Sequence, residues 1–191
     1  MNYKEEESIM KKTAMLFATG FEEVEALTVV DLLRRAEIVC DIVALDGASE
    51  IAGSHGIAVC ADKAFGDVNF DGYDALLLPG GQPGTKNLGN DERVLSLLRE
   101  FNRAGKLTAA ICAAPTVLAK AGLLEGKRAT CYPGLEGKLT GATPGAEAVI
   151  ADGTVITSRG VGTAIPFALS LVEYLDSKER ADALAESIVY R

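Results

Sequence analysis

The chain has 191 residues, of which 48% are hydrophobic and 24% are charged, the profile of an ordinary globular protein. This length accommodates one α/β domain with a sizeable core and leaves little room for a second. Lys and Arg number 19 against 27 Asp and Glu, so the formal net charge is −8. Because a duplex-binding protein needs a basic face, this balance speaks against sequence-specific nucleic-acid binding.

The N-terminus and the cysteines bear on the protein's location. Residues 1–10 hold three consecutive glutamates and no apolar segment of a secretory signal, and Met10 resembles a second start. We therefore expect a mobile tail over residues 1–10 and a single domain over 11–191. No apolar run reaches the roughly 18 residues of a membrane helix. With four dispersed cysteines and one histidine, a Cys/His zinc site lacks ligands at suitable spacing. We expect a cytoplasmic protein without membrane association and without a metal.

Predicted strands and helices alternate along the chain. Short apolar runs predict strands over residues 13–18, 37–45, 73–78 and 107–111. Helical periodicity and capping residues predict helices over 24–36, 90–104, 115–121, 166–175 and 179–189. Residues 37–45 and 53–60 are expected to form a hairpin-like excursion, and residues 147–158 a hairpin around Asp152-Gly153. This order predicts a mostly parallel sheet covered by helices on both faces.

Three predicted strands end in unusual chemistry. The first is followed by Gly20-Phe21-Glu22-Glu23-Val24-Glu25, the third by Pro79-Gly80-Gly81-Gln82 and the fourth by Cys112. In open α/β sheets the ligand crevice lies beyond the carboxyl ends of the strands. We therefore expect these three segments to meet at one functional site.

Cys112 lies at a predicted strand-to-helix corner among small residues, Ala109-Ala110-Ile111-Cys112-Ala113-Ala114-Pro115. Small neighbours let the chain turn sharply, as at a nucleophile elbow, and Pro115 suits a first helical turn. A thiol near a helix N-terminus is stabilised as thiolate. The alternative is a small buried apolar side chain, which free cysteines often are.

Four stretches together make the chain similar to a known superfamily: residues 20–25, Leu78-Pro79-Gly80-Gly81, residues 110–115 and Thr157-Ser158-Arg159-Gly160. Over Lys12 to Val189 the chain resembles the DJ-one/ThiJ/PfpI superfamily, in the branch of the parkinsonism-associated protein deglycase and its bacterial relatives. The resemblance implies a flavodoxin-like sandwich, usually a homodimer, which agrees with the α/β pattern. Phosphate-loop chemistry has no matching motif, and Gly160-Val161-Gly162-Thr163 is only a fragment of a dinucleotide fingerprint.

The resemblance also implies site residues. Cys112 is the nucleophile, readily oxidised to sulfinate, and Glu25 contacts its sulfur. Because a carboxylate and a thiolate repel, Glu25 is expected to stay protonated and to donate a hydrogen bond to sulfur. The alternative for Glu25 is an exposed acid in a first helical turn. Gly80 and Gly81 can offer backbone N–H groups to the sulfur or form a plain turn, and in the family the Gly81 and Ala113 amides line the pocket.

Two positions depart from relatives that carry a histidine near the nucleophile. Tyr132 stands where many deglycase relatives have histidine, and Ala113 where PfpI-type peptidases have one. We expect Tyr132 to be a pocket residue that can donate a hydrogen bond or orient the substrate. A Cys-His protease or amidotransferase is therefore disfavoured, because a phenol is a poor base at neutral pH. The resemblance also places residues at a dimer interface: Glu22, Arg34, Arg35, His55 and Cys60. The alternatives are a surface or structural acid for Glu22, a structural role for His55, a solvated helix face for the two arginines and a core thiol for Cys60.

Two functional hypotheses use the same residues. The first is an enzyme, a cysteine-dependent protein or nucleotide deglycase or a glutathione-independent glyoxalase, acting on 2-oxoaldehydes such as methylglyoxal and on their adducts. This scheme requires no cofactor. The second is a redox sensor or stress chaperone that responds through oxidation of Cys112 to sulfinate without turnover. The two differ in whether product appears.

Overall fold

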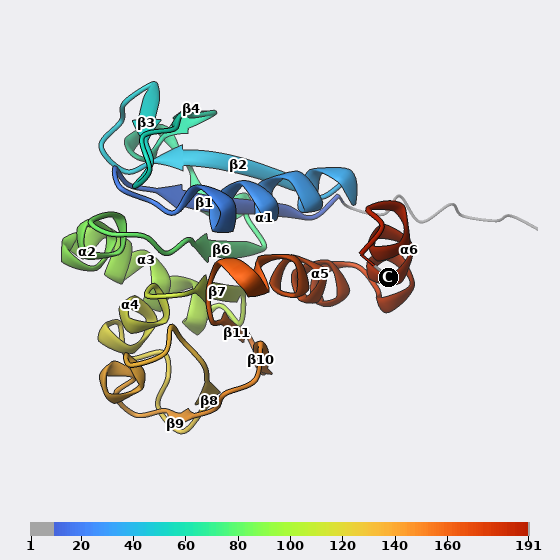
Figure 1. Cartoon of the computed structure of the whole chain (residues 1–191). Helices are drawn as coiled ribbons and strands as arrows, with labels where there is room; N and C mark the ends of the chain where they lie inside the picture. Colours follow the sequence, from blue (N-terminus) through green and yellow to red (C-terminus); the bar gives the residue numbers. More distant parts are fainter. Residues whose placement is uncertain (1–9, 191) are drawn as a thin grey trace, which may run out of the picture.

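A computed structural model describes residues 10–190 and is built around one seven-stranded sheet (Figure 1). The strand order is β10-β11-β7-β6-β1-β2-β5, and every neighbouring pair is parallel except β10 with β11. The strands are β1 (Lys12–Phe17), β2 (Val39–Ala44), β5 (Lys63–Ala64), β6 (Ala75–Leu78), β7 (Leu107–Ile111), β10 (Val149–Asp152) and β11 (Val155–Ser158). The predicted hairpin around Asp152-Gly153 is confirmed by the antiparallel β10–β11 pair.

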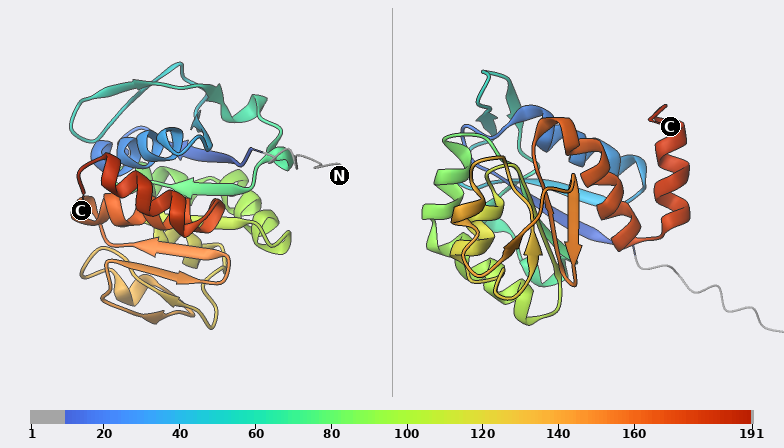
Figure 2. Two further views of the ribbon diagram at one scale, coloured as in Figure 1. Left: turned by 90° about the vertical axis from the view of Figure 1, so that its right-hand side faces the viewer. Right: turned by 60° about the horizontal axis from the view of Figure 1, so that its bottom comes forward.

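Helices cover both faces of this sheet. One layer contains α1 (Glu23–Arg35), α5 (Ala164–Leu175) and α6 (Lys178–Ser187), with α5 packed between the other two (Figure 2). The other layer contains α2 (Gly84–Asn90), α3 (Glu92–Arg103) and α4 (Pro115–Lys120). The predicted flavodoxin-like α/β fold is therefore confirmed.

The alternation of side chains along β1 explains the two layers of core. Met15 and Phe17 face the core under α1 and α5, whereas Ala14 and Leu16 face the core under α3 and α4. All four are fully buried, because a central parallel strand has covered faces on both sides. The sequence of β1 is therefore apolar at successive positions from Ala14 to Phe17.

Two parts of the sequence prediction were wrong. The hairpin lies wholly within residues 50–60, between β3 (Glu50–Ala52) and β4 (Ala58–Cys60), and projects from the body of the molecule (Figure 1). Residues 37–45 instead supply β2, which pairs in parallel with β1 and β5, because its buried apolar side chains belong inside the main sheet. Helix α2 was also missed, since Pro83 and the glycines at positions 84 and 89 are turn signals in sequence.

Shorter elements complete the described chain. They are the strand pair β8 (Arg128–Ala129) and β9 (Thr143–Pro144), and the 3₁₀ turns η1 (Phe65–Asp67), η2 (Phe70–Gly72), η3 (Glu136–Lys138) and η4 (Val161–Thr163). The predicted tail lies outside the described residues except for Met10, which is exposed. Between residues 10 and 190, none of the helices combines the length and the apolar character needed to cross a bilayer.

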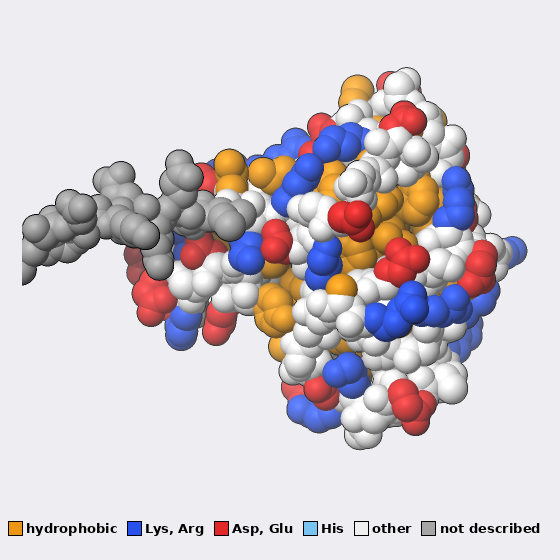
Figure 3. Space-filling model, turned by 180° about the vertical axis from the view of Figure 1, so that it is seen from behind, with side chains coloured by type: hydrophobic (Ala, Val, Ile, Leu, Met, Phe, Trp, Pro, Cys, Tyr) orange, Lys and Arg blue, Asp and Glu red, His pale blue; other side chains and the backbone are white. Residues whose placement is uncertain are grey.

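The face opposite to that of Figure 1 carries charges of both signs. Apolar side chains gather near its middle, and Lys and Arg lie next to Asp and Glu around them (Figure 3). This mixture shows no uniformly basic surface on that face. The visible charge pattern therefore agrees with the acidic composition.

Candidate active site

The site lies where four adjacent parallel strands end. Strands β11, β7, β6 and β1 are neighbours in the sheet, so their carboxyl ends share one edge. The segments that follow them border a pocket of about 800 Å³ together with the β3–β4 loop. Glu25, Gly81, Cys112 and Gly160 all line this pocket. The structure thus brings together the three strand-end segments expected from the sequence and adds a fourth, after β11.

Cys112 occupies a strained corner directly after β7. Its φ is 66°, in the left-handed region that non-glycine residues rarely adopt, at a cost of about 1–3 kcal/mol. The Cys112 N–H donates to the Ser158 carbonyl at 2.9 Å, and its carbonyl accepts from the Tyr132 N–H at 2.7 Å. These two bonds hold the corner, and helix α4 begins three residues later at Pro115. The geometry aims the thiol into the pocket, as at a nucleophile elbow.

Glu25 is a fully buried acid in the first turn of α1. Its N–H donates to Oε2 of Glu22, the N-cap residue, at 2.7 Å, which fixes the start of the helix. The carboxyl oxygen Oε2 of Glu25 accepts the Gly80 N–H at 3.0 Å. Its other oxygen, Oε1, has no hydrogen-bond partner among residues 10–190. The carboxyl group is therefore held firmly on one side and available on the other.

The thiol of Cys112 and the carboxyl of Glu25 share one buried environment. Burial raises the pKa of Glu25 to about 7, although a hydrogen bond with Cys112 opposes the shift. Burial also raises the pKa of Cys112 to about 12, and the neighbouring Glu25 carboxylate adds to this. The repulsion vanishes when Glu25 is protonated, since a neutral acid donates to sulfur instead. Because the pKa of Glu25 lies below that of Cys112, the carboxyl ionises first and Cys112 keeps its proton near neutral pH, contrary to the thiolate expected at a helix N-terminus. The ionised Glu25 is then the neighbouring base that can take the thiol proton.

The backbone donors around the sulfur differ in part from the expected set. The N–H groups of Gly81 and Ala113 hydrogen-bond to the Cys112 sulfur and favour its ionised form. The Gly80 N–H does not serve the sulfur, because it donates to Glu25. Gly80 thus holds the Glu25 carboxyl in place. The N–H groups of Gly81 and Ala113 are the two donors that can stabilise negative charge at the sulfur.

Gly80 is tightly enclosed by the reactive pair. A Cβ at this position would lie 2.4 Å from Glu25 Oε2 and 2.6 Å from the Cys112 Cβ. The substitution Gly80→Ala is therefore expected to push the carboxyl and thiol apart, to destabilise the fold by about 1–3 kcal/mol and to lower the reactivity of Cys112. Thermal unfolding and the rate of thiol alkylation measure the two effects.

The matched control is Gly66→Ala. A Cβ on Gly66 would meet nothing within 4 Å, so this variant should behave like the wild type in both measurements. Equal stability and equal alkylation rates for the Gly80 and Gly66 variants would contradict the described contact between Gly80 and the reactive pair.

The other expected residues divide into two groups. Tyr132 and His55 lie on the wall of the pocket, and Glu22 lies there as well. Tyr132 is 53% exposed at the rim of the pocket. Its ring lies next to Gly160, where a Cβ would be 3.6 Å from Tyr132 Cδ2. Arg34, which binds the Cys40 carbonyl and Asp62, and Arg35, which pairs with Asp31, do not line the pocket. Cys60 is exposed at the end of β4 and does not line it either.

The loop after β11 contains pocket residues to which the sequence analysis gave no role. Arg159 and Thr163 line the pocket. The Thr163 hydroxyl accepts the N–H of Arg159 at 3.2 Å and of Gly160 at 3.0 Å, which organises the loop. The position of these residues directly after a strand of the parallel sheet was the signal that could have identified them.

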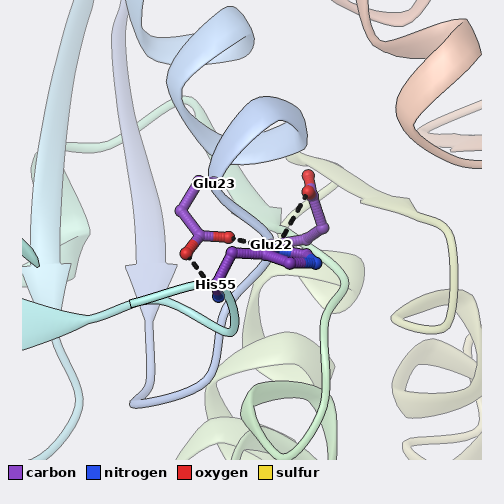
Figure 4. A group of neighbouring side chains, drawn as sticks. All are labelled: Glu22, Glu23 and His55. Carbon is purple, nitrogen blue, oxygen red and sulfur yellow. Dashed lines mark hydrogen bonds and ion pairs between the residues drawn. The ribbon is translucent and has the colours of Figure 1, made fainter. Parts of the chain in front are cut away.

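A second acidic group adjoins the pocket where α1 meets the β3–β4 loop (Figure 4). One ligand atom each of Glu22, Glu23 and His55 lies within 4.8 Å of the others. The Glu23 carboxylate already accepts hydrogen bonds from the Ser54 hydroxyl and the His55 N–H. Because these donors occupy its oxygens, the geometry assigns Glu23 to holding the loop, and we assign no metal to this group.

Fold and site together define a class of protein: a flavodoxin-like α/β protein whose strained strand-end cysteine is paired with a buried glutamate. Residues 11–174 match the DJ-1/PfpI family model. The chain is 39% identical to Protein dj-1beta of Drosophila melanogaster, covering 94% of this chain and 98% of that protein. It is 36% identical to the Parkinson disease protein 7 homolog of Danio rerio, covering 95% and 98%.

Solved structures agree with this assignment. The crystal structure of Drosophila melanogaster DJ-1beta superposes with a TM-score of 0.90 at 38% identity, covering 95% of this chain and 98% of that one. A cysteine-to-alanine mutant of a DJ-1 superfamily protein from Salmonella typhimurium superposes with a TM-score of 0.91 at 34% identity, covering 95% and 100%. The chain belongs to the DJ-1/PfpI family, as the sequence motifs predicted.

Proposed function

We propose that the protein is a cysteine-dependent enzyme that converts 2-oxoaldehydes such as methylglyoxal to 2-hydroxy acids, or removes them from the adducts they form. The observation that supports this most is the pair of Cys112 and Glu25, a half-buried thiol at a strained corner beside a buried acid with a pKa of about 7. A carboxyl that titrates near neutral pH can both give and take a proton during one turnover. The pocket volume of about 800 Å³ exceeds the size of a three-carbon substrate.

The first step forms a bond between the Cys112 sulfur and the aldehyde carbon. Glu25 takes the thiol proton as the sulfur attacks and the carbonyl opens, and it then gives that proton to the resulting oxyanion while the Gly81 and Ala113 N–H groups stabilise the charge. The product of this step is a hemithioacetal. Glu25 is left ionised and beside the substrate's former aldehyde carbon, ready to act as a base.

The later steps move protons and then release the product. Glu25 removes the C–H proton of the hemithioacetal carbon as the neighbouring ketone oxygen is protonated, which gives an enediol. Return of a proton to the second carbon and loss of the proton from the first oxygen leave a thioester. Water then breaks the carbon–sulfur bond, releasing the hydroxy acid and the thiolate, with the water proton returning to Glu25. Oxidation at one carbon balances reduction at the other, so the scheme needs no external oxidant.

The direct test is lactate formation from methylglyoxal without added glutathione or metal. The wild-type protein should form lactate, and the Cys112→Ser variant should not. Folded wild-type protein that forms no lactate, and releases no free amine from a methylglyoxal-treated peptide, would contradict the proposed enzyme.

The second candidate function is a redox sensor that responds through Cys112. The specific observation in its favour is the pair of N–H donors from Gly81 and Ala113, which would bind the oxygens of a sulfinate as well as a substrate oxyanion. Peroxide treatment followed by intact mass tests it, with the addition of two oxygen atoms expected in the wild type and not in Cys112→Ser. Three expectations stay predictions: a stress-chaperone role, a cytoplasmic location, and a homodimer whose interface contains Glu22, Arg34, Arg35, His55 and Cys60.

A further inference from the structure

We propose that His55, held by Glu23, is the proton donor for the substrate's ketone oxygen in the Cys112 pocket and is thus a further catalytic residue. This inference rests on the proposed function. It assigns the one histidine of the chain, which the sequence analysis placed at a dimer interface, to the site itself. Four points support it: the reaction needs a second proton donor, the imidazole lies at the pocket wall, nearby carboxylates favour its protonated form, and buried Glu23 holds it in place.

The chemical need arises because the reaction protonates two substrate oxygens. Glu25 supplies the proton of the first oxygen and must then be ionised to remove the C–H proton, so it cannot protonate the second oxygen in the same step. Arg159 lines the pocket, but a guanidinium does not release its proton in proteins. Among the described pocket residues, Glu22, His55 and Tyr132 remain as titratable side chains, and the Glu22 carboxylate is already engaged as the N-cap of α1, where it accepts the Glu25 N–H at 2.7 Å.

The imidazole ring is oriented by one nitrogen and free at the other. Nδ1 lies 2.9 Å from Oε2 of Glu23 and 3.8 Å from Oε1 of Glu22 (Figure 4). Within residues 10–190 the ring forms its hydrogen bonds at Nδ1, with Ser54 and Glu23, and Nε2 is open. With Glu23 accepting at Nδ1, the Nε2–H of the protonated ring can donate to a pocket ligand. This carboxylate–imidazole arrangement is the one that fixes a catalytic histidine in a set orientation.

The charges around His55 favour the acid form of the ring. Glu22 and Glu23 approach it from α1, and the other titratable or charged groups of the pocket are Glu25, Cys112, Tyr132 and Arg159. The hydrogen bond and charge of Glu23 raise the pKa of His55 above its ordinary value of 6.5. A raised pKa increases the share of rings in the protonated form, which is the form that donates a proton to the second oxygen.

The support of His55 is buried and rigid. The side chain of Glu23 is only 4% exposed, whereas that of His55 is 70% exposed at the pocket wall. Burial would raise the pKa of Glu23, but hydrogen bonds from the His55 side chain and backbone outweigh it and bring the value to about 2. The Glu23 carboxylate also accepts the Ser54 hydroxyl at 3.2 Å and the His55 N–H at 2.6 Å. Glu23 is thus the positioning residue for the loop and its ring.

Kinetics test the proposed role. His55→Gln should lower kcat for methylglyoxal by about 10²-fold with little change in KM, because the substrate still binds Cys112. In the wild type, kcat should fall as pH rises through the pKa of His55, since the acid form is lost. That limb should be absent in His55→Gln and should move to lower pH in Glu23→Gln, where the carboxylate that raises the pKa is gone.

Two comparison variants sharpen this result. Ile57→Ala alters an exposed side chain of the same loop that does not line the pocket, and it should keep the wild-type kcat and pH profile. Tyr132→Phe removes the competing donor and should retain most of kcat. Wild-type kinetics in His55→Gln, or a large loss in Tyr132→Phe with none in His55→Gln, would overturn the proposal.

A measurement without turnover tests whether His55 reaches a group on Cys112. The untagged chain has one histidine, so its imidazole proton signals in NMR belong to His55. Iodoacetate places a carboxylate on the Cys112 sulfur, and this added negative charge should raise the pKa of His55. The iodoacetate-treated Cys112→Ser variant, in which exposed Cys60 still reacts, should show no rise. An unchanged pKa in the alkylated wild type would overturn the proposal.

The kinetic measurement and the NMR titration together distinguish the failure of this inference from the failure of the proposed function. Wild-type turnover together with a His55 signal that ignores Cys112 alkylation rejects His55 as donor and leaves the enzyme intact. Absence of turnover, with a His55 pKa that responds to alkylation, rejects the proposed enzyme and its donor step while placing His55 within reach of ligands on Cys112.

Discussion

The Cys112→Ser variant is expected to form lactate from methylglyoxal at less than about one thousandth of the wild-type rate, while its stability changes little. Serine fits the strained corner at φ 66° as well as cysteine does, and the backbone bonds to Ser158 and Tyr132 do not involve the side chain. A hydroxyl, however, is a weak nucleophile without an adjacent base that can ionise it. Lactate assay and thermal unfolding on the same samples measure rate and stability together.

The other cysteines provide matched controls. Cys60 is exposed on β4, and Cys131 is buried beside Tyr132. Cys60→Ser should retain the wild-type rate, since the side chain does not line the pocket. Cys131→Ser should retain most of it. Full turnover by Cys112→Ser, or a comparable loss in Cys60→Ser, would refute Cys112 as the nucleophile.

Glu25→Gln should lower kcat by about 10²- to 10⁴-fold, because the amide keeps the shape of the carboxyl but cannot exchange a proton with the substrate. Gln retains an oxygen that can accept the Gly80 N–H, so the fold should persist. The pH dependence of the rate at which iodoacetamide alkylates Cys112 should also change, because the charge of Glu25 no longer opposes ionisation of the thiol. A Glu25→Gln variant with the wild-type kcat would exclude this carboxyl from the reaction.

The same substitution should change how stability depends on pH. The folded-state pKa of Glu25, about 7, lies above the ordinary value of 4.5, so the folded protein binds this proton more tightly than the unfolded chain. The resulting stability is fully present below pH 4.5 and is lost as pH rises to about 7, in total about 3 kcal/mol. Urea unfolding at both pH values should show this loss in the wild type and not in Glu25→Gln.

The control for this pH effect is Glu50→Gln. Glu50 is an exposed residue of β3, so its replacement should leave the pH dependence of the wild type unchanged. The prediction fails if Glu25→Gln and the wild type lose the same stability between pH 4.5 and 7.

Most of the fold could be predicted from local patterns. Strands such as β1 and β7 are apolar runs that end at glycine or at a small-residue corner, and α3 carries a regular apolar face with Asp91 as its cap. Helix α2 and the pairing of β2 could not be predicted in this way. Pro83 and two glycines mask the helix, and the partners of a strand depend on contacts distant in sequence.

The site was predicted in part. The sequence motifs pointed to Cys112, Glu25, Gly81 and Ala113. The structure brings the first three into one pocket and places the Ala113 N–H at the Cys112 sulfur. The different use of the Gly80 N–H, which donates to Glu25, depends on an approach between segments 55 residues apart. The place of His55 depends in the same way on Glu23, which lies 32 residues away and holds the β3–β4 loop.

The sequence by itself determined the family and the α/β alternation, and it pointed to Cys112 and Glu25 as the candidate reactive pair, because each is encoded in short motifs and their order. Only the tertiary structure decided which groups adjoin Cys112 and how they titrate. Burial beside a thiol, and not residue type, raises the pKa of Glu25 to about 7. Contact with a buried carboxylate brings an exposed loop histidine to the pocket wall. Both effects arise from distances across the fold, which a linear pattern does not specify.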